Sequence, residues 1–211
     1  MGMKGSVEFW DKVSKNYDSR NMAKYARTYN KTVELSKKYL KDTDTVLDYG
    51  CGTGITTIEL AQNVKKVYAI DTSLEMIKVS QMKAENNGIS NIEFDVSDIF
   101  NEQFQENSFD VVMAFNILCY LNDLNKMLDR VYKLLKPDGV FISATDCLGD
   151  KKTLVTQAQS LLSKVGAIPF ISNLKRTELQ NKIESANFSI MESHNLYDSP
   201  PNIFIAAKKS V

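Results

Sequence analysis

The chain has 211 residues, of which 43% are hydrophobic, and this length allows one well-buried core. Lysine plus arginine number 26 and aspartate plus glutamate number 26, so the formal net charge is zero. Without a broad positive field the chain has no general means of attracting polyphosphate, which argues against nucleic acid as a partner. The three cysteines form no CxxC or Cys/His cluster, which favours reduced thiols and argues against a metal site.

The N-terminal segment has no apolar run of signal-peptide length, and no later segment approaches the roughly 18 apolar residues that span a bilayer. We therefore expect a cytoplasmic protein with no membrane partner. Aromatic residues at helical spacing in residues 1–40 predict an N-terminal helical cap. We interpret Phe9, Trp10 and Val13 as ordinary core residues, whereas Tyr17 and Tyr25 have polar ends that suit a pocket wall.

From residue 41 onward, short β-branched runs alternate with amphipathic stretches, which is typical of a parallel sheet with helices on both faces. The predicted strands cover residues 45–49, 66–70, 92–96, 109–114, 139–144, 188–194 and 203–207. The predicted helices cover residues 55–62, 74–86, 124–135 and 177–186, with a turn at 136–139 and Thr177 as the last N-cap.

Two features decide how the C-terminal part is organised. Residues 146–173 break the alternation, with a helix-like stretch at 154–162, and we expect an insertion beside the sheet. Residues 199–202 form too short a connection for a parallel crossover, so the last two strands must pair antiparallel. The sequence thus predicts a single domain over residues 1–211, with a doubly wound, mostly parallel α/β sheet closed by an antiparallel hairpin.

The most informative motif is Val46–Gly54, a hydrophobic strand that runs into three glycines at alternate positions. Glycine permits a positive φ and removes the Cβ that would hold a ligand away from the backbone. The dinucleotide pattern GxGxxG requires glycine at position 55, where this chain has Ile55. Asp48 precedes the first glycine by two residues, where it would repel pyrophosphate and attract a cation. The loop therefore suits a zwitterionic amino acid better than a phosphate.

Polar or acidic residues also follow the next three strands. Asp71 ends the second strand, where a carboxylate can accept hydrogen bonds from a ribose diol; the alternative is that it caps the following helix. Asp98 follows the third strand beside Ile99, which could pack on a purine ring, and Asp95 competes for the same role. The fourth strand ends in Phe115 and Asn116. We expect all four loops to converge on one crevice at the carboxyl ends of the strands.

These motifs together resemble the class I S-adenosylmethionine-dependent methyltransferases, of the small-molecule type that includes the ubiquinone- and menaquinone-biosynthesis methyltransferases. Residues 47–54 are similar to the first motif of that family, and residues 134–139 resemble its LLKPGG turn, with Asp138 in place of the first glycine. The resemblance extends from about Thr45 to the final hairpin. It implies a Rossmann-like, seven-stranded sheet of order 3-2-1-4-5-7-6, S-adenosylmethionine as cofactor and S-adenosylhomocysteine as product.

The cofactor-binding residues expected on this basis lie in the loops after the first four strands and in the N-terminal cap. They are Tyr17, Asp48, Gly50, Cys51, Gly52, Gly54, Asp71, Thr72, Met76, Asp98, Ile99, Phe115 and Asn116. Methyl transfer from a sulfonium needs alignment more than a dedicated catalytic group, so the catalytic residue remains unknown. His194 is the only histidine and the one candidate general base; a lone histidine without a visible partner is more often structural or exposed.

The acceptor is expected to be a small molecule. Its walls are expected to come from the N-terminal helices, from the residues after the fourth strand and from the insertion, namely Cys119, Tyr120, Leu154, Leu161, Leu162, Ile168 and Phe170. Packing of the insertion's apolar residues on the sheet is the alternative. Three other functions stay open: a non-catalytic S-adenosylmethionine-binding protein, a protein methyltransferase and a nicotinamide-dependent oxidoreductase. Ile55 and Asp48 argue against the last.

Overall fold

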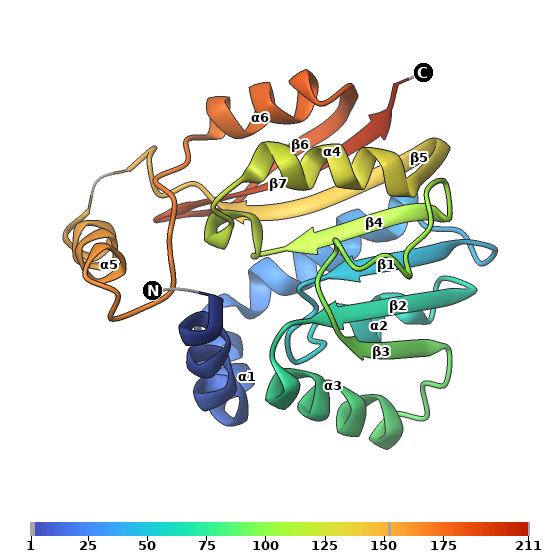
Figure 1. The fold of residues 1–211 in the computed structure, drawn as a ribbon, viewed down its shortest axis with the longest axis horizontal. Helices are drawn as coiled ribbons and strands as arrows, with labels where there is room; N and C mark the ends of the chain where they lie inside the picture. The colour runs from blue at the N-terminus through green and yellow to red at the C-terminus, as the bar shows by residue number, and fades with distance from the viewer. Residues whose placement is uncertain (1–2, 152, 211) are drawn as a thin grey trace.

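The computed structural model describes residues 3–151 and 153–210, which form one seven-stranded sheet with helices on both faces (Figure 1). The strand order is 3-2-1-4-5-7-6; β7 is antiparallel to both of its neighbours, and the other pairs are parallel. The predicted fold and its antiparallel hairpin are therefore confirmed. The strands are β1 Thr45–Tyr49, β2 Lys66–Asp71, β3 Ile92–Val96, β4 Phe109–Phe115, β5 Leu135–Asp146, β6 Phe188–Asp198 and β7 Pro201–Lys209.

The sheet separates two hydrophobic cores, and helices cover the core on each face. The elements are α1 Met3–Ser36, η1 Lys37–Tyr39, α2 Thr57–Ala61, α3 Leu74–Asn86, η2 Leu118–Tyr120, α4 Leu124–Leu134, α5 Leu154–Lys164 and α6 Arg176–Ser185. On one face Leu128 of α4 and Ile183 of α6 pack against the sheet. On the other face Leu35, Leu60 and Ile77 bring in α1, α2 and α3. No described helix is both long and apolar enough to cross a membrane.

Two local predictions differ from the structure: the cap of α6 is wrong, and the predicted turn lies within an irregular part of a strand. α6 begins one residue early, and Thr177 is not its cap; the Asp150 carboxylate instead accepts from the Arg176 N–H at 3.2 Å. The turn predicted at 136–139 lies inside β5, which starts by pairing Leu135 with Phe109 and resumes after a register shift. Asp138 takes up that irregularity with φ of 64°.

The chain between β5 and α6 leaves the sheet and returns to the same place. The Gly149 N–H donates to the Leu174 carbonyl at 2.9 Å, which closes the excursion at its base. A Cβ on Gly149 would lie 2.3 Å from the Asn173 carbonyl oxygen, so only glycine allows this approach. The helix α5 that the excursion carries stands out beyond the carboxyl ends of the parallel strands (Figure 1).

Candidate functional site

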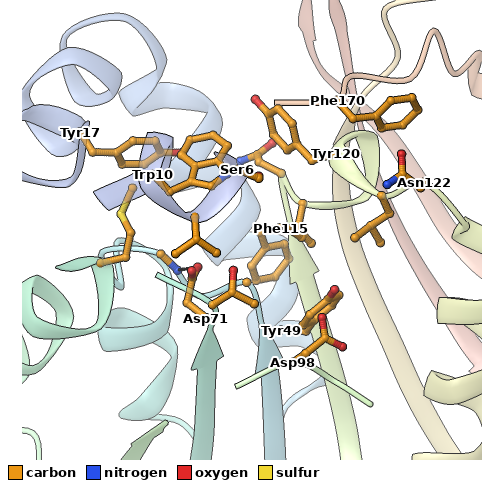
Figure 2. A pocket seen from close by; sticks show the side chains of 18 residues that line it. Ser6, Trp10, Tyr17, Tyr49, Asp71, Asp98, Phe115, Tyr120, Asn122 and Phe170 are labelled. Carbon is orange, nitrogen blue, oxygen red and sulfur yellow. Dashed lines mark hydrogen bonds between the residues drawn. The ribbon is translucent and has the colours of Figure 1, made fainter. Parts of the chain in front are cut away.

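A cavity of about 230 Å³ lies at the carboxyl ends of β1, β2 and β4 (Figure 2). Parallel α/β sheets place ligands at this edge, where the strand order reverses. The expected cofactor-binding residues that line the cavity are Tyr17, Gly50, Gly52, Asp71, Thr72, Met76, Asp98, Phe115 and Asn116. A smaller hollow of about 40 Å³ shares several of these residues and adds Asp48 and Cys51. The structure thus brings most of the expected residues to one place.

Two of the expected residues do not reach either space. Ile99 is fully buried, because its side chain points into the core beneath the loop that carries Asp98. Gly54 packs against α3, with no room for a side chain. Neither residue is therefore placed to touch a ligand directly.

The glycine loop folds as the sequence pattern predicts. Gly50, Gly52 and Gly54 have φ of 71°, 54° and 73°, a region that disfavours residues with a Cβ. The loop is fixed to the sheet because the N–H groups of Gly50 and Cys51 donate to the Ile70 carbonyl at 2.8 and 3.0 Å. A Cβ on Gly52 would meet no atom within 4 Å, so the open space above this residue belongs to the cavity.

Gly54 is expected to be required for stability. A Cβ here would lie 2.2 Å from Ser80 Oγ, so Gly54→Ala should cost about 2–3 kcal/mol through left-handed strain plus the clash. Gly52→Ala is the matched control, because it carries the strain without the clash. Ser80 Oγ is buried without a partner, so Ser80→Ala should be near neutral and should restore part of the loss. Urea unfolding of the three single variants and of the double variant Gly54→Ala/Ser80→Ala measures these changes in stability. Equal losses for the two glycine variants would contradict the packing described.

Asp71 is held in place by backbone donors from two loops. Its Oδ2 accepts from the Gly52 N–H at 3.0 Å, and its Oδ1 accepts from the Ser73 N–H at 2.8 Å. Each carboxylate oxygen keeps a free lone pair for a further donor. The cap of α3 is Ser73, whose hydroxyl accepts from the Met76 N–H at 3.2 Å, so Asp71 does not serve as that N-cap. Its carboxylate is left available at the cavity surface.

Asp48 is buried below the glycine loop. Burial raises the pKa of its carboxyl to about 7; the hydrogen bond from Thr57 Oγ1, at 2.6 Å, opposes this rise, and the negative charge of Asp71 adds to it. A carboxyl with this pKa ionises near neutral pH, and a cation bound nearby would favour the ionised form. Asp48 is therefore buried beneath the loop, and its ionisation state depends on whether a cation occupies the smaller hollow.

Aromatic side chains line the side of the cavity that lies across from Asp71 and Asp98 (Figure 2). The Trp10 ring makes edge contacts with Tyr120 and Tyr17, at centroid distances of 5.1 and 6.3 Å. The interpretation of Trp10 as ordinary core is wrong: it is half-buried and lines the cavity, because α1 crosses above the strand ends. Tyr17 lines the cavity as expected. Tyr25 does not, since it packs edge-on against Tyr197 at 5.1 Å.

Two acidic side chains fix α1 over the site. Asp11 Oδ1 accepts from the Ser73 hydroxyl at 2.6 Å and from the Glu75 N–H at 3.2 Å, at the positive N-terminus of α3. Seven residues, or about two helical turns, later, Asp18 forms an ion pair with Lys83 at 2.6 Å and accepts a hydrogen bond from Thr53. Sequence reasoning missed both residues. Their spacing of seven, shared with Trp10 and Tyr17, was the available signal for a common helix face.

Several other candidates lie outside the cavity. His194 is on the edge strand β6, with its side chain 45% exposed and Nε2 2.6 Å from a Glu192 carboxylate oxygen. Cys119 is buried and does not line the cavity; burial raises the pKa of its thiol well above the ordinary value. Its neighbour Tyr120 does line the cavity. The position of His194 leaves the site without a histidine among its described lining residues.

The insertion contributes less to the cavity than expected. Of its apolar residues only Phe170 lines the cavity; it reaches the rim because the Ser172 N–H donates to the Cys119 carbonyl at 2.8 Å. Leu154, Leu161 and Leu162 neither line the cavity nor pack on the sheet, and all three are exposed to solvent. The prediction that these leucines form an acceptor wall and the alternative that they pack on the sheet are both wrong. Each requires the apolar face of α5 to point inward.

The family model described as "Methyltransferase domain" matches residues 40–198, about three quarters of the chain. This chain belongs to that family. Among curated relatives, an uncharacterized protein of Methanocaldococcus jannaschii is 33% identical over 152 residues, covering 72% of this chain and 55% of the relative. Phosphoethanolamine N-methyltransferase 2 of Caenorhabditis elegans is 29% identical over 154 residues, covering 69% of this chain and 35% of the relative. The chain thus spans about half or less of these relatives.

Solved structures share the fold. A geranyl diphosphate methyltransferase in complex with S-adenosylmethionine superposes with a TM-score of 0.74 at 16% sequence identity, covering 92% of this chain and 90% of that one. At this identity the likeness shows the common architecture alone. It agrees with the strand order described above and with the Rossmann-like class expected from the sequence.

Proposed function

We propose that this protein binds S-adenosylmethionine and transfers its methyl group to a small acceptor that carries no phosphate. The observation that carries the proposal is the cavity itself, in which the glycine loop and two acids face a wall of aromatic rings. One half has the groups that a nucleoside with an amino-acid tail requires. The other half has the surface that a flat or apolar acceptor requires.

The residues present fit this cofactor. Asp71 can accept hydrogen bonds from a ribose diol with the lone pairs that Gly52 and Ser73 leave free. Asp98 lines the same cavity and can accept from an exocyclic amine. The hollow beside Tyr17, Asp48 and the glycine loop suits an ammonium and carboxylate pair. When bound, the sulfonium supplies an activated methyl and its own leaving group.

The chain's own part is to orient the acceptor and to exclude water. Burial raises the pKa of the Tyr17, Tyr49 and Tyr120 hydroxyls, so these phenols stay protonated at neutral pH and act as hydrogen-bond donors. Trp10 and Phe170 close the aromatic side. None of these groups is a strong base, so the acceptor should be one that needs alignment more than deprotonation.

The charge of the cavity supports a narrower acceptor class. None of the described lining residues is lysine or arginine, whereas Asp71 and Asp98 are acidic. A phosphate buried here would have no partner of opposite charge and would lie near two carboxylates. The names of the Caenorhabditis elegans relative and of the solved structure above refer to phosphorylated compounds. We propose that this cavity takes an acceptor without phosphate.

Formation of S-adenosylhomocysteine from matched acceptors tests the proposal. An aryl methyl thioether that carries a hydroxymethyl group and the phosphate ester of that hydroxyl differ only in the group at issue, because the sulfur that accepts the methyl is the same and loses no proton. We expect kcat/KM for the neutral compounds to exceed that of their esters at least about thirtyfold, the cost of one unpaired buried charge. Preference for the esters would contradict the acceptor class. Tight cofactor binding without turnover of any acceptor, small molecule or protein, would favour the non-catalytic alternative.

A further inference from the structure

Helix α5 presents its apolar residues to solvent. Leu154, Leu161 and Val165, the last at the C-cap, lie on one stripe because positions i, i+7 and i+11 share a helix face. Their exposed fractions are 86%, 62% and 69%, and the neighbouring Leu162 is 43% exposed. Helices of a soluble domain normally turn such a stripe toward the core. This one is left uncovered by the described part of the chain.

The polar face of α5 holds the helix against the protein. Thr156 is buried and forms a reciprocal capping box with Thr153. Ser163 Oγ accepts from the Ile171 N–H at 2.9 Å, and Asn173 donates to Ser160 Oγ at 3.2 Å. These contacts fix the rotation of the helix, so the outward direction of its apolar stripe follows from its hydrogen bonds. Other exposed large apolar residues, such as Met82 and Met191, are scattered over separate elements.

The charge around α5 identifies what the stripe would contact. Residues 150–176 contain five basic residues and one acidic residue, a net charge of plus four, although the whole chain is neutral. The rest of the chain therefore carries minus four. Lys151 and Lys164, both exposed, belong to this basic segment. A second copy packed stripe to stripe would bring two positive segments together, whereas an anionic surface would attract this segment and repel the remainder.

We propose that α5 is an interfacial helix that seats the protein on an anionic lipid surface. Apolar residues of such helices enter the boundary between headgroups and acyl chains, while lysines at the edge contact the phosphates. The proposal departs from the expectation of no membrane partner, and it concerns a helix on the surface that spans nothing. The chain runs from α5 to Phe170 at the rim of the cavity, so docking would place the cavity mouth beside the lipid. It stands independently of the methyl-transfer proposal.

Flotation of the full chain with vesicles tests this docking. We expect binding to vesicles that contain phosphatidylglycerol, little binding to pure phosphatidylcholine, and release by salt. Leu161→Asp should lower the partition coefficient at least about tenfold, because it replaces an apolar side chain that would enter the lipid with a charge that an anionic surface repels. Lys164→Glu should lower it about twenty-fivefold, at about fivefold for each of two unit charges.

Matched variants elsewhere separate docking from general effects. Met82→Asp places the same charge at an apolar residue that is 55% exposed on α3, and Lys65→Glu reverses an exposed charge outside the segment. Both should bind vesicles as the unchanged chain does, and urea unfolding should show that all four variants are folded. Absence of flotation, or equal losses in the control variants, would overturn the proposal. So would Leu161→Asp converting a dimer to a monomer in light scattering, since a second copy would then cover the stripe.

Discussion

Asp71→Ala is expected to weaken S-adenosylmethionine binding about a hundredfold, close to 3 kcal/mol. The carboxylate would lose its charge-assisted hydrogen bonds to the ribose hydroxyls. It would also release the Gly52 N–H, which it holds at 3.0 Å, and the glycine loop would lose a support. Calorimetric titration at constant salt measures the change in dissociation constant.

Asp95→Ala is the matched control for this variant. Asp95 lies near the end of the adjacent strand, and its carboxylate accepts from Gln103 at 2.7 Å, away from the cavity. It should bind the cofactor as the unchanged chain does. Asp71→Asn keeps one acceptor oxygen and should fall between the two. If Asp71→Ala stays folded yet binds within twofold of the unchanged chain, the ribose assignment is wrong.

The pH dependence of folding should reveal the buried Asp48. Its pKa is about 7 in the folded chain and about 3.9 in a disordered one, so the folded state retains a proton that the unfolded state loses. Stability from this group is complete below pH 4 and is lost as the pH rises to about 7. The upper bound on the loss is about 4 kcal/mol, from three pH units. Asp48→Asn should remove this loss.

Urea unfolding at pH 4.5, 6 and 7.5 tests the sign. The stability of Asp48→Asn relative to the unchanged chain should rise with pH across this window. Asp110→Asn is the flat control: although burial opposes it, Lys136 at 2.8 Å and the Thr45 N–H lower the pKa of Asp110. Asp110 is therefore ionised in both the folded and the unfolded chain across this window, so the relative stability of Asp110→Asn should change only below about pH 4. A pH-independent difference for Asp48→Asn would show that Asp48 is ionised throughout.

The sheet and its ligand edge could be predicted because short-range signals determine them. Alternating strands and helices define a parallel sheet, and the four-residue connection at 199–202 allows only an antiparallel last pair. Gly50 and Gly52 mark a backbone conformation that few other residues adopt. Asp71 and Asp98 follow strands directly, so placing those strands places these residues. Their roles toward a ligand stay predictions.

The covering elements could not be predicted in the same way. Hydrophobic spacing identifies the inner side of a helix, but it does not show whether that side contacts the core or a cavity. For this reason the prediction places Trp10 in the core, whereas the residue lines the cavity. The position of α1 depends on Asp11 and Asp18 meeting partners more than 50 residues away, at Ser73 and Lys83. The apolar stripe of α5 was expected to face inward, whereas local serine and threonine hydrogen bonds turn it outward.

Calorimetric titration of the full chain with S-adenosylmethionine, S-adenosylhomocysteine and NAD tests the central claim most directly. The glycine loop, Asp48 and Asp71 predict saturable one-to-one binding of the first two and no measurable binding of NAD, because the position that its pyrophosphate requires is Ile55. Binding of NAD alone would contradict the account and would assign the cavity to a dinucleotide.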